Sequence, residues 1–270
     1  MTLIELIGFI SAAIIGFSLG LIGGGGSILT VPVLVYLLGI DPITATAYSL
    51  FIVGFSALIG GIDYARNGLV NYKTGIVFTI PAFISVYLTR LLVVPALPEF
   101  WFSFLGIEVT RSIGIMVIFA LLMIVASYSM IKGKKDLEVT NKKSVQPKFN
   151  YPLIILEGLI VGSLTGLVGA GGGFLIIPAL VVLAKLPMKE AVGTSLLIIA
   201  VKSLLGFIGD VQSGNEIDWV FLSIFSVIAV VGIFIGTYFS SKVDGKKLKT
   251  GFGWFVLVMG SLMIIKELMF

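Results

Sequence analysis

Long apolar stretches constrain this chain more than any other feature of its sequence. They recur along the 270 residues at 3–22, 43–62, 75–94, 113–131, 153–168, 191–208, 219–239 and 252–265. A helix needs about 20 apolar residues to cross a bilayer core of about 30 Å. Charged residues make up only 12% of the chain, against about 25% in soluble domains. We therefore expect an all-α polytopic membrane protein, because the stretches are continuous and do not alternate as barrel strands do.

The residue types that are missing limit the chemistry. The chain has no cysteine and no histidine, which excludes disulfides, thiolate metal sites and the commonest general base. We therefore expect no enzymatic activity and no catalytic residues. We also expect no metal site and no cofactor. The net charge of +4 does not require nucleic acid as a partner, because basic residues accumulate on the cytoplasmic side of membrane proteins.

The chain repeats itself at an offset of 146 residues. Residues 16–68 align without a gap to residues 162–214, and 19 of these 53 positions are identical. Glycine and proline positions coincide along with the aliphatic ones, so the match reflects more than shared hydrophobicity. Internal repeats with paired glycine and proline interruptions are typical of secondary transporters. Two short apolar stretches, 28–38 and 174–184, follow the repeated glycine clusters and are too short to cross a bilayer comfortably.

A polar linker at 132–150, which holds six lysines, divides the chain into a first membrane repeat (1–131) and a second (151–270). The positive-inside rule places this linker in the cytoplasm. The same rule favours treating each glycine-rich segment as a broken helical hairpin that enters and leaves on one side. Each repeat then has one hairpin and three transmembrane helices. The odd number of crossings makes the two repeats inverted, with both termini outside.

The glycine clusters are the first candidate binding site. We expect short helices to begin after them, at Ser27 and at Gly173, with free amide N–H groups and the positive end of the helix dipole. Glycine lets a ligand approach the backbone closely, so two such helix starts meeting near the midplane would bind an anion. The alternative is close helix packing by small residues. The candidate residues are Gly23, Gly24, Gly25, Gly26 and Ser27 in the first repeat, and Gly169, Ala170, Gly171, Gly172 and Gly173 in the second.

Four polar side chains complete the candidate site. Lys202 lies about 18 Å along its apolar helix, where a charge is costly and indicates function; the alternative is a lysine that reaches the interface or pairs with an acid such as Glu157. Ser49 and Ser195 occupy equivalent positions in the two repeats, and Thr194 is adjacent. Their hydroxyls can donate to an anion or bond to their own helix backbone.

Three charged residues outside this set are expected at the ends of helices. We expect Arg90 and Arg111 to lie near the outer interface, with their guanidinium groups extended toward water. Asp210 is expected to be a residue at a helix end.

The repeated motifs resemble those of the sulfite exporter family, known as TauE/SafE. Residues 20–26 (GLIGGGG) are followed by Pro32, and residues 166–172 (GLVGAGG) by Pro178. Residues 45–49 (ATAYS) and 191–195 (AVGTS) are also similar to that family. The resemblance covers nearly the whole chain and implies export of sulfite, organosulfonates or related small anions across a bacterial cytoplasmic (inner) membrane. The two repeats differ at Gly24/Ala170 and at Ser27/Gly173, so equivalent binding by both halves does not follow.

The function expected from these observations is a transporter with a central anion site, whose two repeats rock around the site to alternate its access. Its partners would be a small anionic substrate and the lipid bilayer. An anion channel of the same architecture and a non-transporting membrane scaffold remain as alternatives. The sequence leaves open the sulfur oxyanion, the coupling ion and the oligomeric state.

Overall fold

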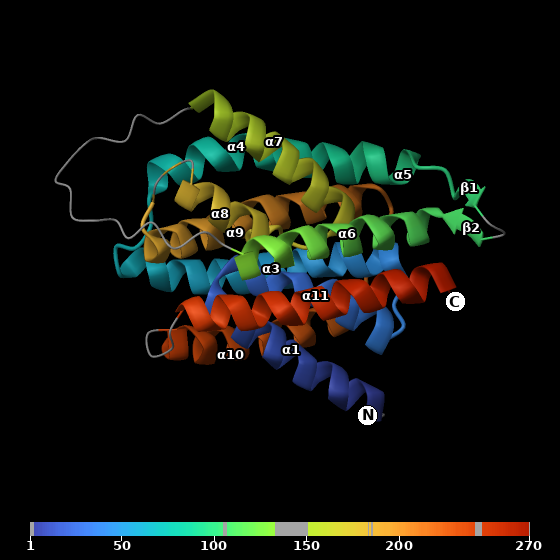
Figure 1. The fold of residues 1–270 in the computed structure, drawn as a ribbon, viewed down its shortest axis with the longest axis horizontal. Coiled ribbons are helices and arrows are strands. Elements are labelled where there is room, and N and C mark those ends of the chain that lie inside the picture. Colours follow the sequence, from blue (N-terminus) through green and yellow to red (C-terminus); the bar gives the residue numbers. More distant parts are fainter. Residues whose placement is uncertain are drawn as a thin grey trace.

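The computed structural model describes residues 3–104, 107–132, 151–182, 184, 186–240 and 245–269, and the expected linker at 132–150 lies outside them except for Lys132, where a helix ends. The expectation of an all-α polytopic fold is confirmed (Figure 1). The helices are α1 (Leu3–Ile22), α2 (Thr30–Pro32), α3 (Pro42–Arg66), α4 (Tyr72–Leu88), α5 (Val94–Ala96), α6 (Arg111–Lys132), α7 (Tyr151–Val168), α8 (Gly173–Val182), α9 (Met188–Gln212), α10 (Trp219–Ser240) and α11 (Gly245–Met269).

Shorter helical and extended segments connect these helices. A 3-10 helix, η1 (Gly24–Leu29), and a π-helical turn, η2 (Val33–Leu37), flank α2, and a second π-helical turn, η3 (Thr89–Val93), joins α4 to α5. Strands β1 (Phe100–Phe104) and β2 (Ile107–Thr110) form an antiparallel pair. The apolar stretches did not predict this pair, which lies in the connection between α5 and α6.

Within the described residues, five helical segments are long and apolar enough to cross a membrane by length and composition: Pro42–Arg66, Tyr72–Ala96, Arg111–Lys132, Met188–Gln212 and Trp219–Phe239. Shorter apolar helices cover Leu6–Ile22, Gly26–Leu37 and Pro152–Val168. Large apolar side chains such as Val220, Val227 and Phe234 are exposed along α10. Such a surface suits contact with lipid and would be costly in water.

Local chemistry explains where the central helix of the first half begins. The Asp41 carboxylate accepts hydrogen bonds from the amides of Ile43 and Thr44, at 2.9 and 3.2 Å. Pro42 follows at the first helical position, where its missing N–H costs nothing. These two residues fix the start of α3, and α3 in turn carries Thr46 and Ser49 into the centre of the molecule.

The two halves interlock. Helix α1 of the first half packs along α10 of the second, and in the equivalent way α7 of the second half packs along α4 of the first. Helices α3 and α9 occupy equivalent positions in the two repeats and pack against each other, as do α6 and α11. Glycines allow the closest of these approaches, because a methyl group on Gly16 would overlap the carbonyl of Ala229 on α10.

The ends of the helices are sorted to the two ends of the bundle. In Figure 1 both chain termini and the β1–β2 pair lie toward one end, whereas α6 ends and α7 begins at the other. Helices α1 and α7, the first helices of the two halves, therefore start from opposite ends. This is the arrangement that inverted repeats require, and the side that faces the cytoplasm stays a prediction.

Candidate functional site

The two glycine clusters meet at the centre of the molecule. A methyl group built on Gly24 would overlap the Cα of Gly173, and one built on Gly173 would overlap the backbone of Gly24. Helices η1 and α8, which these residues begin, are in contact. Segments 149 residues apart in the sequence thus touch backbone to backbone, as the expectation of two converging helix starts required.

The two clusters do not have the same backbone. In the first, Gly23 has a positive φ of 72° and the helical turns begin directly at Gly24. The expected start at Ser27 is therefore wrong, because Gly24 to Gly26 follow helical geometry once the chain has turned at Gly23. In the second, Gly169, Gly171 and Gly172 have φ values of 71°, 63° and 68°. A helix cannot pass through such residues, so α8 starts at Gly173, as expected.

Contacts around the clusters follow the repeat. Gly23 lies against Val192 on α9, and Gly169 lies against Thr46 at the equivalent position on α3. Gly26 lies against α1 near Leu19, and a methyl group on Gly172 would overlap the equivalent residue of α7, Thr165. Ala170 is fully buried. The burial of Gly25 is not among the described features. The sequence repeat is therefore also a repeat of contacts.

Lys202 lies beside the second cluster. Its side chain is fully buried, and its Nζ donates to Thr165 Oγ1 at 2.7 Å. A methyl group on Gly172 would lie 2.9 Å from this nitrogen. In the described residues no carboxylate lies within ion-pair distance of Lys202, so neither an interfacial position nor a pair with Glu157 is found.

The four candidate hydroxyl groups have different environments. Ser49 is fully buried, and its Oγ has no hydrogen-bond partner in the described residues. Ser195 Oγ donates to the Val192 carbonyl of its own helix at 2.8 Å, and Ser27 Oγ donates to the Gly24 carbonyl at 2.6 Å. Thr194 Oγ1 accepts from the Asn71 amide at 2.9 Å. Among the described residues, Ser49 is therefore the candidate hydroxyl without a protein partner, whereas Ser195 and Ser27 donate to nearby carbonyls and Thr194 accepts from an amide 123 residues away.

The structure reveals a charged cluster where none was expected. Arg90, at the start of η3, is fully buried and does not extend to the outer interface, so that prediction is wrong. Its Nη1 donates to Thr46 Oγ1 at 3.0 Å and to Asp210 Oδ1 at 3.3 Å. Asp210 lies near the end of α9, as expected, but is buried there. Each charge of this buried pair offsets part of the cost of burying the other. The pair is therefore less costly at this depth than an isolated arginine would be.

Arg111 is half-buried, and its expected place near the outer interface stays a prediction. It is the first residue of α6, and its guanidinium donates to the carbonyl oxygens of Val94 and Leu97 at 3.5 and 3.4 Å.

In the described residues no three acidic side chains gather into a group that could hold a metal ion.

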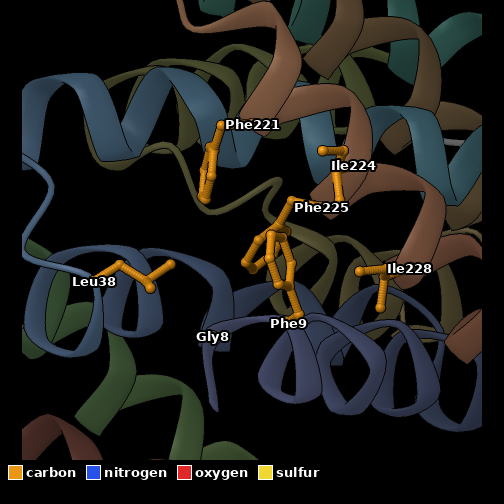
Figure 2. Close-up of a pocket in the computed structure, with 7 residues that line it drawn as sticks. All are labelled: Gly8, Phe9, Leu38, Phe221, Ile224, Phe225 and Ile228. Atoms are coloured by element: carbon orange, nitrogen blue, oxygen red, sulfur yellow. The ribbon is translucent and has the colours of Figure 1, made fainter. Parts of the chain in front are cut away.

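An apolar pocket of about 530 Å³ lies between α1, the end of η2 and α10. Figure 2 shows it with Phe9 and Phe225 facing one another, and Leu38, Phe221, Ile224 and Ile228 around them. The pocket contains no charged side chain and none of the candidate residues. It is therefore unsuited to an anion, and the candidate site is the buried region around the two clusters.

Comparison with known proteins supports a transport role. The profile of the family described as sulfite exporter TauE/SafE matches residues 8–263. A probable membrane transporter protein of Xylella fastidiosa is 28% identical over 257 residues, covering 94% of this chain and 92% of its own. Proteins described in the same words from Methanocaldococcus jannaschii (27% identity; 93% and 94% of the two chains) and Bacillus subtilis (28%; 88% and 89%) are also similar. No solved structure matches the chain significantly.

Proposed function

The chain belongs to the sulfite exporter TauE/SafE family, and we propose that this membrane transporter exports small sulfur-containing oxyanions such as sulfite or organosulfonates. The site would lie where the two glycine clusters meet, between repeats of inverted orientation. Export would take place across a bacterial cytoplasmic membrane, with the linker at 132–150 inside and both termini outside. Rocking of the two repeats around the site would expose it to each side in turn.

The observation that carries this proposal is the place of Lys202. Its ammonium group lies beside Gly172. The Gly172 carbonyl accepts hydrogen bonds from the Leu175 and Ile176 amides at 3.0 and 3.1 Å, so Gly172 lies at the first turn of helix α8. The start of a helix carries partial positive charge and free N–H groups. A buried ammonium group beside it would be repelled, which makes the pair unfavourable unless an anion joins the two.

The glycines leave the start of α8 without side chains of its own. Positive φ values at Gly171 and Gly172 turn the chain sharply before α8, where Val53 and Thr165 pack against the turn, so a ligand would bind the amides as the turn moves. Ser49 offers an unpaired buried hydroxyl as a further donor. An oxyanion with three or four oxygens on one atom could accept from the ammonium group, an amide and a hydroxyl together.

The proposal can be tested by uptake of radiolabelled sulfite into proteoliposomes that contain the purified protein, with methanesulfonate, sulfate and chloride as competitors. Lys202→Met keeps the length of the side chain but removes its charge, and should abolish saturable uptake. Lys189→Met is the matched control, because Lys189 is exposed at the start of the same helix. Uptake should be inhibited by methanesulfonate and not by chloride.

Two results would contradict the proposal. One is the absence of any protein-dependent anion flux from folded wild-type protein, which would favour a scaffold role. The other is wild-type uptake by Lys202→Met, which would remove the ammonium group from the site. Counterflow separates a transporter from a channel, because only a transporter exchanges labelled for unlabelled substrate faster than net flux.

A further inference from the structure

We propose that the guanidinium group of Arg90 forms a second oxyanion subsite, which binds a monovalent oxyanion along its unpaired Nε–Nη2 edge. This inference rests on the proposed function and extends it, because Arg90 belongs to neither glycine cluster.

The guanidinium of Arg90 uses only one of its nitrogens. Its Nη1 donates to both Thr46 and Asp210, whereas Nε and Nη2 are buried and have no partner in the described residues. Unpaired buried donors are rare and costly. The Nε–Nη2 edge is also the side of arginine that binds two oxygens of one oxyanion at once. The unpaired edge therefore has the geometry of an unfilled oxyanion site.

Asp210 serves as a positioning residue for this edge. It meets the guanidinium end-on, through Nη1 alone, and its Oδ1 also accepts from Asn215 at 3.4 Å. A carboxylate that occupied the other edge would block it, but Asp210 instead orients the group and leaves that edge unpaired. Its own negative charge would still repel a bound anion, so Asp210 both positions the subsite and weakens it.

The subsite is connected to the glycine site. Thr46, which accepts from Arg90, also lies against Gly169. Lys202 lies at Gly172, three residues further along the same turn, and the Cα atoms of Gly169 and Gly172 are at most about 11 Å apart. Lys202 thus lies beside one end of the second glycine turn, and Arg90 reaches the other end through Thr46. An anion could pass from one to the other while the turn moves.

The balance of buried charge indicates the class of substrate. Among the described residues the buried charged side chains are Arg90, Lys202 and Asp210. In their ordinary ionisation states, two positive charges and one negative charge leave a net charge of +1. A single monovalent oxyanion neutralises this charge, whereas a divalent one leaves an excess negative charge in a medium where that is costly. Sulfonates and hydrogen sulfite fit this requirement better than sulfate does.

Binding of methanesulfonate and of sulfate to the purified full-length protein, measured by titration calorimetry, tests the subsite. Arg90→Lys keeps the charge but removes the planar edge, and should weaken methanesulfonate binding by about tenfold, the loss expected for one charge-assisted hydrogen bond. Asp210→Asn keeps an acceptor for Nη1 but removes the repulsion, and should tighten binding by about threefold. Arg111→Lys is the control and should change the affinity for neither anion. Arg111 also has a buried Nε without a partner in the described residues, but it lacks the second unpaired nitrogen that completes the edge in Arg90.

The opposite signs separate a binding role from a structural one. If Arg90 and Asp210 form only a structural ion pair, both variants will lower thermal stability and neither will bind methanesulfonate more tightly. Unchanged or weaker binding by Asp210→Asn would overturn the inference, even if Arg90→Lys failed to fold. Tighter binding of sulfate than of methanesulfonate by the wild type would overturn the monovalent class.

Failure of this inference and failure of the proposed function look different. Loss of binding in Lys202→Met together with wild-type affinity in Arg90→Lys and Asp210→Asn would leave the glycine site in place and remove the Arg90 subsite. A wild-type protein that binds neither anion would overturn both.

Discussion

The contact between Gly24 and Gly173 gives the sharpest test of the central arrangement. In Gly173→Ala the added methyl group would overlap the Cα of Gly24, and in Gly24→Ala it would overlap the Cα of Gly173. In both variants the obstacle is backbone, which has no rotamer to change. One of the two turns must therefore move, and the two halves must separate where they meet.

The cost follows from this geometry. Overpacking a filled interior costs about 1–3 kcal/mol, and a clash of backbone with backbone belongs at the upper end of that range. Replacing glycine by alanine also restricts the unfolded chain, which returns about 0.4–1 kcal/mol. The net loss in the free energy of unfolding should be about 2 kcal/mol. For a chain of this size that corresponds to a fall in melting temperature of about 4–8 °C.

Gly251→Ala is the matched control. Gly251 lies within α11, and a methyl group there would meet nothing within 4 Å. Alanine is favoured over glycine in a helix by about 1 kcal/mol, so the control should be as stable as the wild type or slightly more so.

The assay combines thermal stability of the detergent-purified protein with uptake of radiolabelled sulfite into proteoliposomes. Gly173→Ala should lower both quantities, and Gly251→Ala neither. The double variant of Gly24 and Gly173 should lose less stability than the sum of the two single changes, because one separation of the turns relieves both clashes. Wild-type stability and uptake in Gly173→Ala would refute the close approach of the two turns.

Two further changes test the supporting contacts. Thr165→Val should lower the free energy of unfolding by about 1–3 kcal/mol and reduce uptake, because it leaves the buried ammonium group of Lys202 without its hydroxyl acceptor. Thr165→Ser keeps the hydroxyl and should behave as wild type. Equal losses in both variants would contradict the role of Thr165 as the acceptor for Lys202. Tyr36→Phe removes the 2.7 Å hydrogen bond to Glu267 on α11 and should lower the melting temperature by about 2–4 °C, the effect of about 1 kcal/mol. Its apparent affinity for sulfite should be unchanged, and a change in affinity without a loss of stability would contradict a purely structural bond.

The sequence predicted the helices well because hydrophobicity alone determines most of them. Each expected apolar stretch coincides with helical segments over most of its length, and the two short ones after the glycine clusters run slightly past the helices that end at Leu37 and Val182. The β1–β2 pair was missed because it lies in a short connection with no periodic signal of membrane length. The early start of η1 at Gly24 was missed for a different reason. Glycine is compatible with both turn and helix, so four consecutive glycines do not reveal which of them turns.

The site was predictable only where the signal is local. Lys202 stands out because a lysine deep in an apolar helix is costly wherever its neighbours lie. Arg90 was assigned to the interface because a long side chain near a helix end can reach water. Its burial depends on Asp210, 120 residues away, and on Thr46, from a third helix. A single sequence carries no information on which distant residues meet, so this cluster required the structure.

The comparison of the two halves separates the scaffold from the chemistry. The backbone contacts of the glycine clusters recur in both repeats, but the polar groups around them do not. The offset of 146 residues pairs Lys202 with Ser56, Thr165 with Leu19, Asp210 with Tyr64 and Thr46 with Val192. Among the described residues, the charged group that lies against a glycine turn is the Lys202 ammonium group, and it lies beside the second turn. If the two repeats rock about a common centre, the anion should travel with the second turn, while the first turn provides the surface against which it moves. Exchanging the partners, with Lys202→Ser and Ser56→Lys together, should then fail to restore binding, because Leu19 stands at the position of Thr165 and the hydroxyl beside the first turn, Ser18 Oγ, already donates to the Ile15 carbonyl.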